Sequence, residues 1–242
     1  MKGAQVQAFL ALWNGIASDQ VQPEYESWHS FEHVPERVGL PGFVDATRYR
    51  CVELPLRYFT LYSLRSLDAL NTSEYRDVFT HPTPWSARMR LLLRDFYRLP
   101  CELCGVHGQG TASQLATVQC RSDSSGLAVK LNAWLEALVL RGGAVRAQWG
   151  VAPPGQDYWL ANTANSLEGP GQDHVIMLEH LDAQLLRHSV QELQAVLLTQ
   201  VSCVGRPEFF EQLTHVRQDE LDSAPGQRRA PHTLLFNQFS GK

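Results

Sequence analysis

Three ionisable side chains near the N-terminus follow the pattern His-x-x-Glu-His, at His29, Glu32 and His33. Residues four apart share one face of a helix, so the two imidazoles could bind one zinc ion, with Glu32 as the general base of a peptidase. However, Pro35 disfavours helical backbone at Val34, and we expect the helix to end near His33. A zinc site also needs a third protein ligand. We therefore predict no metal here and expect His29 to lie in solvent.

His33 remains a candidate for proton transfer, because an imidazole titrates near neutral pH. Ideal-helix geometry places it almost opposite the apolar stripe of this helix, which consists of Trp28, Phe31, Pro35 and Val38. If the helix ends near His33, the ring can instead reach over the rim of the neighbouring sheet. Glu32 or Glu36 would then orient it, and a hydrogen-bonded structural role is the alternative.

Residues 57–64 predict a strand with two different faces. Phe59 and Leu61 form an apolar face, which is suited to packing against helices. The opposite face is suited to a lumen, where hydroxyl groups can bond an organic ligand. It carries Tyr58, Thr60 and Tyr62.

Four more side chains are candidates for substrate contact. Arg48 lies on a predicted strand, and an inward guanidinium there would bind a carboxylate, phenolate or enolate, whereas an outward one would lie on the surface. A proline-rich break at residues 81–84 could bring His81 and Trp85 toward the same pocket. Trp13, in the first predicted strand, is the fourth candidate.

Cys101 and Cys104 form a Cys-x-x-Cys pair, with His107 nearby. A structural zinc site usually needs four ligands, and a redox pair usually lies at the start of a helix, whereas this pair lies at the end of a predicted strand. We therefore predict neither function. Five cysteines, an odd number, also argue against a disulfide framework.

The composition is that of an ordinary globular protein, with 242 residues, 44% hydrophobic and 19% charged. This length suffices for one large domain or two of about 120 residues each. A net charge of −4 and a pI near 6.1 argue against binding of nucleic acid or anionic membrane. Because no apolar run approaches the roughly 20 residues that span a bilayer, and the signal-peptide pattern is weak, we predict a cytoplasmic protein.

The elements that must position these side chains follow one order twice, β-α-β-β-α-β. The first set has strands at residues 6–13, 43–52, 57–64 and 96–105, and helices at 23–34, 67–80 and 85–94. The second set has strands at 115–120, 144–151, 175–180 and 201–204, and helices at 127–140 and 183–198. We place two units at residues 1–106 and 107–216, followed by a C-terminal tail at 217–242. An apolar patch at 234–239 would either dock on a neighbour or be disordered.

This order predicts the fold class α+β, with two tandem ferredoxin-like βαββαβ units. Each unit would have a four-stranded antiparallel sheet with helices on one face. The first strand is apolar at both alternating sets of positions, whereas a one-sided sheet alternates apolar with polar residues. The second face must therefore be covered, and we expect the two sheets to pack against each other.

Residues 32–37 (Glu-His-Val-Pro-Glu-Arg), 40–43 (Leu-Pro-Gly-Phe) and 48–50 (Arg-Tyr-Arg) are similar to the dimeric α+β barrel superfamily, in particular its EthD-like members. Those members carry a His-x-Pro element at the end of the first helix, and His33 matches its histidine. The resemblance extends from Phe9 to about Tyr97 and is topological from Leu115 to Val204. It implies that the two units, fused in one chain, join their sheets into an intrachain α+β barrel.

The superfamily includes cofactor-free monooxygenases, muconolactone isomerases, polyketide-modifying lyases and cyclases, and haem-binding enzymes. We predict a cofactor-independent enzyme of the lyase, isomerase or cyclase type, which acts on a small aromatic or polyketide-like molecule by His-mediated proton transfer. The predicted catalytic residues are His33, Glu32 and Arg48. The predicted substrate-binding residues are Tyr58, Tyr62, Trp13, His81 and Trp85.

Two alternatives remain open at this point. One is a non-catalytic binding or accessory protein that uses the same pocket without turnover. The other is a haem- or metal-dependent oxidoreductase of the same fold. The predicted partner is a small-molecule substrate, with a homodimer left open and with neither nucleic acid nor membrane. The leading prediction includes no cofactor and no metal.

Overall fold

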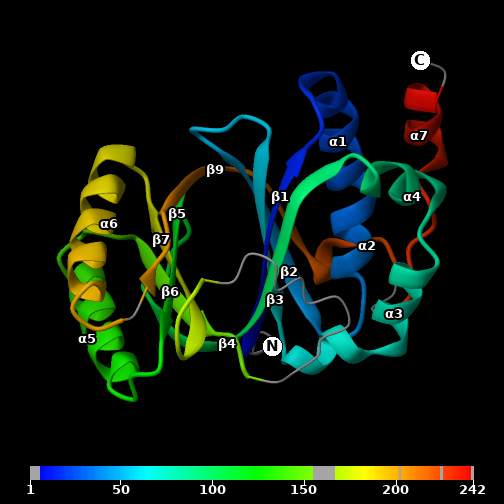
Figure 1. Cartoon of the computed structure of the whole chain (residues 1–242). Helices are drawn as coiled ribbons and strands as arrows, with labels where there is room; N and C mark the ends of the chain where they lie inside the picture. The colour runs from blue at the N-terminus through cyan, green and yellow to red at the C-terminus, as the bar shows by residue number, and fades with distance from the viewer. Residues whose placement is uncertain (1–5, 155–166, 202, 224–225, 241–242) are drawn as a thin grey trace.

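The computed structural model describes residues 6–154, 167–201, 203–223 and 226–240. Eight antiparallel strands close into a barrel in the order β7-β6-β4-β1-β3-β2-β9-β5, and β5 pairs back with β7. Helices cover the barrel on two opposite sides (Figure 1). The barrel strands are β1 (Ala8–Ile16), β2 (Phe43–Cys51), β3 (Arg57–Leu64), β4 (Leu93–His107), β5 (Gln114–Ser122), β6 (Arg146–Val151), β7 (Gln172–His180) and β9 (Glu208–Arg217).

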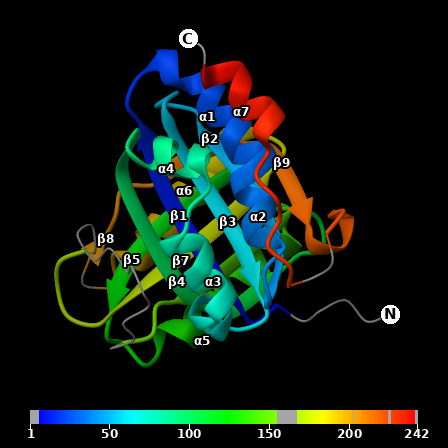
Figure 2. The same ribbon diagram turned by 90° about the vertical axis from the view of Figure 1, so that its right-hand side faces the viewer.

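The helices of the N-terminal half and the C-terminal tail lie together on one side of the barrel (Figure 2). They are α1 (Gln22–Trp28), η2 (His29–His33), α2 (Val34–Val38), α3 (Ser73–Thr80), α4 (Pro84–Arg90) and α7 (Thr233–Ser240). Three short 3₁₀ turns accompany them, η1 (Asp19–Val21), η3 (Leu67–Asn71) and η5 (Gln218–Glu220). The opposite side carries α5 (Leu127–Leu140) and α6 (Ala183–Leu197). None of the helices in the described part of the chain has the length and apolar character to cross a membrane.

The barrel interior is packed with apolar side chains. The strands alternate between this interior and the helix layers, as the pleat requires. Phe9, Ala11 and Trp13 of β1 face inward, whereas Leu10 and Leu12 face the helices. The prediction that both faces of the first strand are buried is therefore confirmed. The α+β fold with a closed sheet barrel is confirmed as well.

The two faces of β3 are the reverse of those predicted. Phe59 and Leu61 point into the barrel, and Tyr58 and Tyr62 point toward the N-terminal helices. The prediction is wrong because the interior of a small barrel must be filled by bulky side chains, which apolar residues do without unpaired polar atoms. The tyrosine hydroxyls therefore lie in the layer between sheet and helices.

The first helical segment also differs from the prediction, because it continues through residues 22–38 instead of ending near His33. Its middle part, η2, is a π-helical turn in which the Val34 N–H donates to the His29 carbonyl. A proline is tolerated at the start of a helix because its missing N–H needs no partner there. Pro35 takes this place near the start of α2, so the wider turn allows the helix to pass the proline.

The predicted last strand, at residues 201–204, is only the two-residue edge strand β8 (Cys203–Val204). The barrel is closed by β9, which the sequence prediction missed. Polar residues interrupt the alternation in β9, and two of its glutamates form ion pairs with arginines of β2 and β3. Arg50 pairs with Glu211 at 2.5 Å, and Arg57 pairs with Glu208. The long polar insertion predicted before β7 lies largely outside the described residues.

The C-terminal tail docks on the N-terminal helices. Phe236 and Phe239 of α7 pack on Trp85, with ring centroids 5.9 and 6.0 Å away. Arg228 bonds Glu36 of α2 at 3.0 Å and Asp77 of α3 at 2.8 Å. Of the two alternatives for the tail, docking on a neighbouring part of the chain is the one found.

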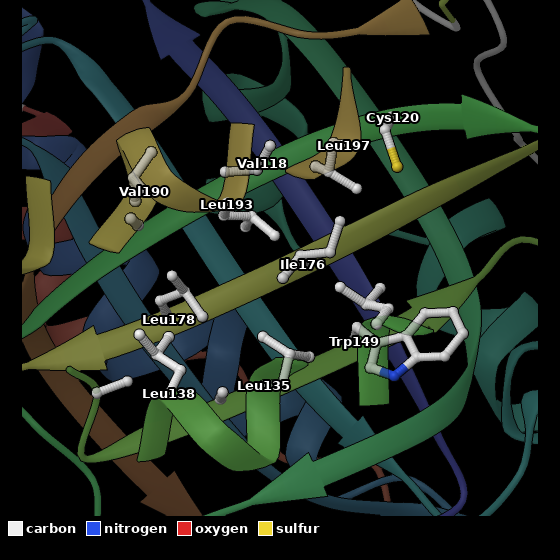
Figure 3. Packing of buried hydrophobic residues seen from close by; sticks show 14 of the residues in the cluster. Val118, Cys120, Leu135, Leu138, Trp149, Ile176, Leu178, Val190, Leu193 and Leu197 are labelled. Carbon is white, nitrogen blue, oxygen red and sulfur yellow. The ribbon is translucent and has the colours of Figure 1, made fainter. Parts of the chain in front are cut away.

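A compact apolar layer separates the C-terminal sheet from α5 and α6 (Figure 3). It is formed by aliphatic side chains from both helices and three strands, together with Cys120 and Trp149. The labelled members are Val118, Cys120, Leu135, Leu138, Trp149, Ile176, Leu178, Val190, Leu193 and Leu197. The equivalent layer of the N-terminal half has a different composition, which creates the candidate site.

Candidate active site

A cavity of about 520 Å³ lies between the N-terminal strands and their helices, outside the barrel lumen. Its walls come from β1, β2, β3 and β4 on one side and from the helical segments on the other. Their surface is mostly apolar, and the polar groups belong to three arginines, two histidines, two tyrosines and one asparagine. The lining residues are Leu10, Leu12, Asn14, Trp28, His29, His33, Arg37, Phe43, Tyr62, Tyr75, Phe79, Arg90, Leu93, Phe96 and Arg98.

His29 and His33 project into this cavity from η2. Their rings stack with centroids 5.1 Å apart and planes 16° from parallel, and Trp28 lies 4.4 Å from the His33 ring. Tyr25 continues the stack on the other side of His29, again at 5.1 Å. The π-helical turn sets this alignment, and such turns occur frequently at functional sites. The expectation of a solvated His29 is wrong, because this residue is only 3% exposed.

Both imidazoles are neutral at neutral pH. Burial lowers the pKa of His29 well below its usual 6.5, and the nearby guanidinium groups of Arg48 and Arg37 lower it further. Burial likewise lowers the pKa of His33 well below 6.5, with Arg37 as the next cause. The Nδ1 atoms of both rings have no hydrogen-bond partner. A neutral imidazole with an unpaired nitrogen is suited to accepting a proton from a bound ligand.

The stack does not form a zinc site. The lone pair of an imidazole nitrogen lies in the ring plane, so two nearly parallel planes do not converge on one ion. Glu32 is not part of the cavity wall, because its carboxylate accepts bonds from the Thr83 hydroxyl at 2.6 Å and the His232 N–H at 2.7 Å. No cluster of three or more His, Cys, Asp or Glu suited to a metal occurs among the residues that the structure describes.

The arginines that line the cavity come from three elements, and the sequence analysis missed all of them. Arg37 of α2 pairs with Glu36 at 2.6 Å. Arg90 of α4 donates to the backbone carbonyls of Val78 and Phe79. Arg98 of β4 donates to the Tyr75 hydroxyl at 3.0 Å. The last was detectable in principle, because it occupies the same alternating face of its strand as the apolar Phe96.

Two of the eight predicted site residues, His33 and Tyr62, lie together in the cavity wall. The Tyr62 hydroxyl is buried without a hydrogen-bond partner, and burial raises the pKa of Tyr62. Tyr58, four residues earlier on β3, lies outside the cavity wall. Its hydroxyl donates to Glu26 at 2.9 Å.

The remaining predicted residues have other partners in the fold. Arg48 is buried and pairs with Glu26 at 3.0 Å, while also donating to Ser30. Trp13 faces the barrel interior and stacks on Tyr97. The His81 side chain is 76% exposed and contacts Asp77, whereas Trp85 is buried and donates to Glu24 at 3.0 Å.

Comparison of the sequence with protein-family models and with curated proteins finds no match. Solved structures, in contrast, share the fold over nearly the whole chain. A protein described as anthrone oxidase-like superposes with a TM-score of 0.64 at 10% identity, covering 91% of this chain and 96% of its own. A protein of Fusobacterium nucleatum subsp. nucleatum, with a proposed monooxygenase function, gives 0.58 at 7% identity and covers 93% and 99%.

A further solved structure, of a protein with a proposed chlorite dismutase function, gives a TM-score of 0.54 at 9% identity and covers 86% and 95%. The names of these three proteins all refer to oxidation or redox chemistry. The predicted lyase, isomerase or cyclase function is therefore wrong, and the comparisons favour the oxidoreductase alternative. At these identities the likeness establishes the fold, and the chain has the α+β barrel fold of these proteins.

Proposed function

We propose that this protein is an oxidoreductase that uses dioxygen to oxidise a small aromatic molecule in the helix–sheet cavity. The observation that carries the proposal is the pair of neutral imidazoles in a largely apolar cavity of about 520 Å³. This volume lies within the range of roughly 300–1,000 Å³ that is typical of small-molecule sites. The fold shared with a protein described as anthrone oxidase-like supports oxidation as the reaction class.

The reaction we propose converts an activated aromatic methylene into a ketone, R₂CH₂ + O₂ → R₂C=O + H₂O. The substrate carbon loses four electrons and dioxygen gains four, so the reaction needs no additional reductant. It begins with the loss of a proton from the methylene carbon, which leaves an electron-rich enolate. The protein must therefore supply a base and stabilise a negative oxygen.

The cavity contains groups suited to both tasks. His33 would accept the proton, because its imidazole is neutral and its Nδ1 atom is unpaired. Arg37 and Arg90 influence the pKa of His33, which places their positive charges near this base. They would stabilise the enolate oxygen as it forms. The apolar and aromatic walls would hold the ring system and exclude bulk water.

Oxidation of anthrone tests the proposal. Oxygen uptake and ketone formation are measured in parallel, and the protein-free rate is subtracted. We expect equal amounts of oxygen consumed and ketone formed. His33→Gln should lower kcat by about 10²- to 10⁴-fold, the usual contribution of a general base. The exposed His188→Gln, which lies outside the cavity, should leave kcat unchanged. A wild-type rate equal to the protein-free rate would overturn the proposal.

A haem-dependent oxidoreductase is the second candidate. A neutral imidazole is a usual axial ligand of haem iron, and arginines suit the haem propionates, so the donor types in the cavity fit this group. His29 or His33 would be the ligand, and the haem would supply the redox chemistry. Metal-bound histidines usually donate a hydrogen bond from their second nitrogen, whereas both Nδ1 atoms here lack a partner. Because of this difference, haem is the second candidate and not the first.

A haemin titration separates the two candidates. If haem is the cofactor, the Soret band should saturate at one haem per chain and should shift in either His29→Gln or His33→Gln. Absence of saturable binding, with anthrone oxidation retained, would exclude the haem-dependent candidate.

We also interpret the chain as two fused ferredoxin-like units, at residues 1–106 and 107–216. The N-terminal strands pair in the order β4-β1-β3-β2, and the C-terminal strands in the order β9-β5-β7-β6. Numbered within each unit, both orders read 4-1-3-2. This agreement supports the tandem interpretation, although the two units share little residue identity.

A further inference from the structure

The charged side chains that line the cavity are of one sign. Arg37, Arg90 and Arg98 contribute guanidinium groups to its wall. Among the described lining residues there is no aspartate or glutamate. Because a buried charge is costly unless it is paired, the counter-charges of these groups must come from outside the wall or from a ligand.

The carboxylate nearest to Arg37 is shared with a second arginine. Glu36 Oε2 accepts a bond from Arg37 at 2.6 Å, and Glu36 Oε1 accepts one from Arg228 of the tail at 3.0 Å. Glu36 is only 1% exposed. Arg228 also pairs with Asp77 at 2.8 Å, so Glu36 and Asp77 together balance Arg37 and Arg228. Neither carboxylate forms an ion pair with Arg90, whose positive charge is therefore additional.

Arg90 is held by uncharged acceptors. Its two Nη atoms donate to the carbonyl oxygens of Phe79 at 2.8 Å and Val78 at 3.1 Å, at the end of α3. Its guanidinium also lies 4.7 Å from the centroid of the Phe79 ring. Burial lowers the pKa of Arg90, and the neighbouring Arg37 lowers it further. These contacts fix the position of the guanidinium without a directly bonded carboxylate, and Glu36 acts on its charge only from a distance.

The Tyr62 hydroxyl adds an unpaired polar group to the same cavity. Tyr62 is 2% exposed, and its oxygen has no hydrogen-bond partner. A buried hydroxyl without a partner lowers the stability of the fold, because it has lost its hydrogen bonds to water. A negatively charged ligand oxygen would accept a hydrogen bond from this hydroxyl.

We propose that the cavity selects aromatic substrates that carry a carboxylate, which the guanidinium group of Arg90 binds, with Arg37 and the Tyr62 hydroxyl as further contacts. A planar guanidinium matches a carboxylate with two parallel hydrogen bonds, and the ligand would supply Arg90 with a bonded negative charge. The inference rests on the proposed function only in taking this cavity as the substrate site.

Three naphthalene derivatives of similar shape test the selection by charge. Binding of 2-naphthoate, 2-naphthamide and 2-naphthylmethylammonium is measured by calorimetry at pH 7.5. We expect 2-naphthoate to bind at least tenfold more tightly than the neutral amide, and the cation to bind most weakly. Equal or weaker binding of 2-naphthoate than of the amide would overturn the inference.

Variants then locate the carboxylate. Arg90→Gln should reduce the affinity for 2-naphthoate by about tenfold or more and leave the affinity for 2-naphthamide nearly unchanged. Arg94→Gln, a change of the same type at an exposed residue outside the cavity, should retain the wild-type preference. Tyr62→Phe provides an independent variant, because it removes only the hydroxyl and should also weaken 2-naphthoate binding. A full preference in both cavity variants would overturn the inference.

Failure of this inference can be distinguished from failure of the proposed function. The binding measurements require no turnover, so a charge preference that depends on Arg90 supports the inference even if anthrone is not oxidised. Conversely, kcat/KM for a carboxylated anthrone should exceed that for anthrone by at least tenfold. Oxidation of both compounds with equal kcat/KM would support the proposed function and overturn the selection by charge.

Discussion

The two halves of the molecule use the same strand order and differ in what separates the sheet from the helices. In the C-terminal half this layer is filled with leucine, isoleucine and valine side chains (Figure 3). In the N-terminal half the corresponding layer contains the cavity, with histidines, arginines and tyrosines in its wall. The half with the candidate site therefore differs from the structural half in the side chains of one layer, and not in topology.

The different side chains of the two layers also have different effects on the stability of the fold. The C-terminal layer buries apolar surface, which stabilises the fold by about 25 cal/mol per Å². The N-terminal layer instead contains unpaired polar atoms on His29, His33 and Tyr62. Each unpaired buried group costs stability, and such costs are commonly tolerated at functional sites. We therefore expect substitutions in the two layers to change the free energy of unfolding by different amounts and, for some groups, in opposite directions.

The largest expected effect on stability comes from truncating one buried leucine to alanine in each half. Leu135→Ala, in the packed C-terminal layer, should lower the free energy of unfolding by about 2–5 kcal/mol, the range for a buried leucine. Leu12→Ala should cost clearly less, because Leu12 borders the cavity and already lacks packing partners on that side.

Urea unfolding of both variants measures this difference directly. The slopes of the transitions should agree with that of the wild type, so that the midpoints report stability. Equal losses for Leu12→Ala and Leu135→Ala would mean that the N-terminal layer is packed as tightly as the C-terminal one.

A second, intermediate effect concerns the pH dependence of stability. The pKa values of His29 and His33 are lowered on folding, so below pH 6.5 the unfolded chain binds more protons at these residues than the folded chain does. The free energy of unfolding should therefore fall as the pH drops below 6.5, by up to about 1.4 kcal/mol per pH unit for each histidine.

Thermal unfolding between pH 7.5 and 5.0 measures this slope. The double variant His29→Gln/His33→Gln should lose less stability over this interval than the wild type, whatever its stability at pH 7.5. The exposed His188→Gln, on the C-terminal helix α6, serves as the control and should keep the wild-type slope. If the double variant kept the wild-type dependence of stability on pH, the two imidazoles would not be buried in the neutral form.

The comparison of the halves also explains what the sequence could predict. The barrel was predictable because β1 is apolar on both faces, a local pattern that requires cover on each side. The filled C-terminal layer follows from helix and strand periodicity, as in α5 with Leu127, Leu131, Leu135 and Leu138 buried. In both cases the structure depends on the burial of apolar side chains, and the sequence pattern of a single helix or strand indicates which of its faces is buried.

The candidate site was less predictable because it depends on relations between elements. The stack of His29 on His33 requires a π-helical turn, which no spacing rule for an α-helix produces. Arg90 and Arg98 enter the cavity from separate elements, and each is unremarkable in its local sequence. The strand β9 was missed because polar residues, such as Glu211 in its ion pair with Arg50, interrupt the apolar alternation.

The smallest expected effect compares two tyrosines on the same strand, β3. Tyr62→Phe should leave stability unchanged or raise it by about 1 kcal/mol, because the variant removes a buried hydroxyl that has no partner. Tyr58→Phe should lower stability by about 1 kcal/mol, because the Tyr58 hydroxyl bonds Glu26 at 2.9 Å and Gln22 at 2.8 Å. Chemical denaturation of the ligand-free protein measures both. Both substitutions remove one tyrosine hydroxyl. Changes of opposite sign in the free energy of unfolding would show that the unpaired hydroxyl in the cavity wall lowers stability. Equal losses would mean that the Tyr62 hydroxyl is paired in solution.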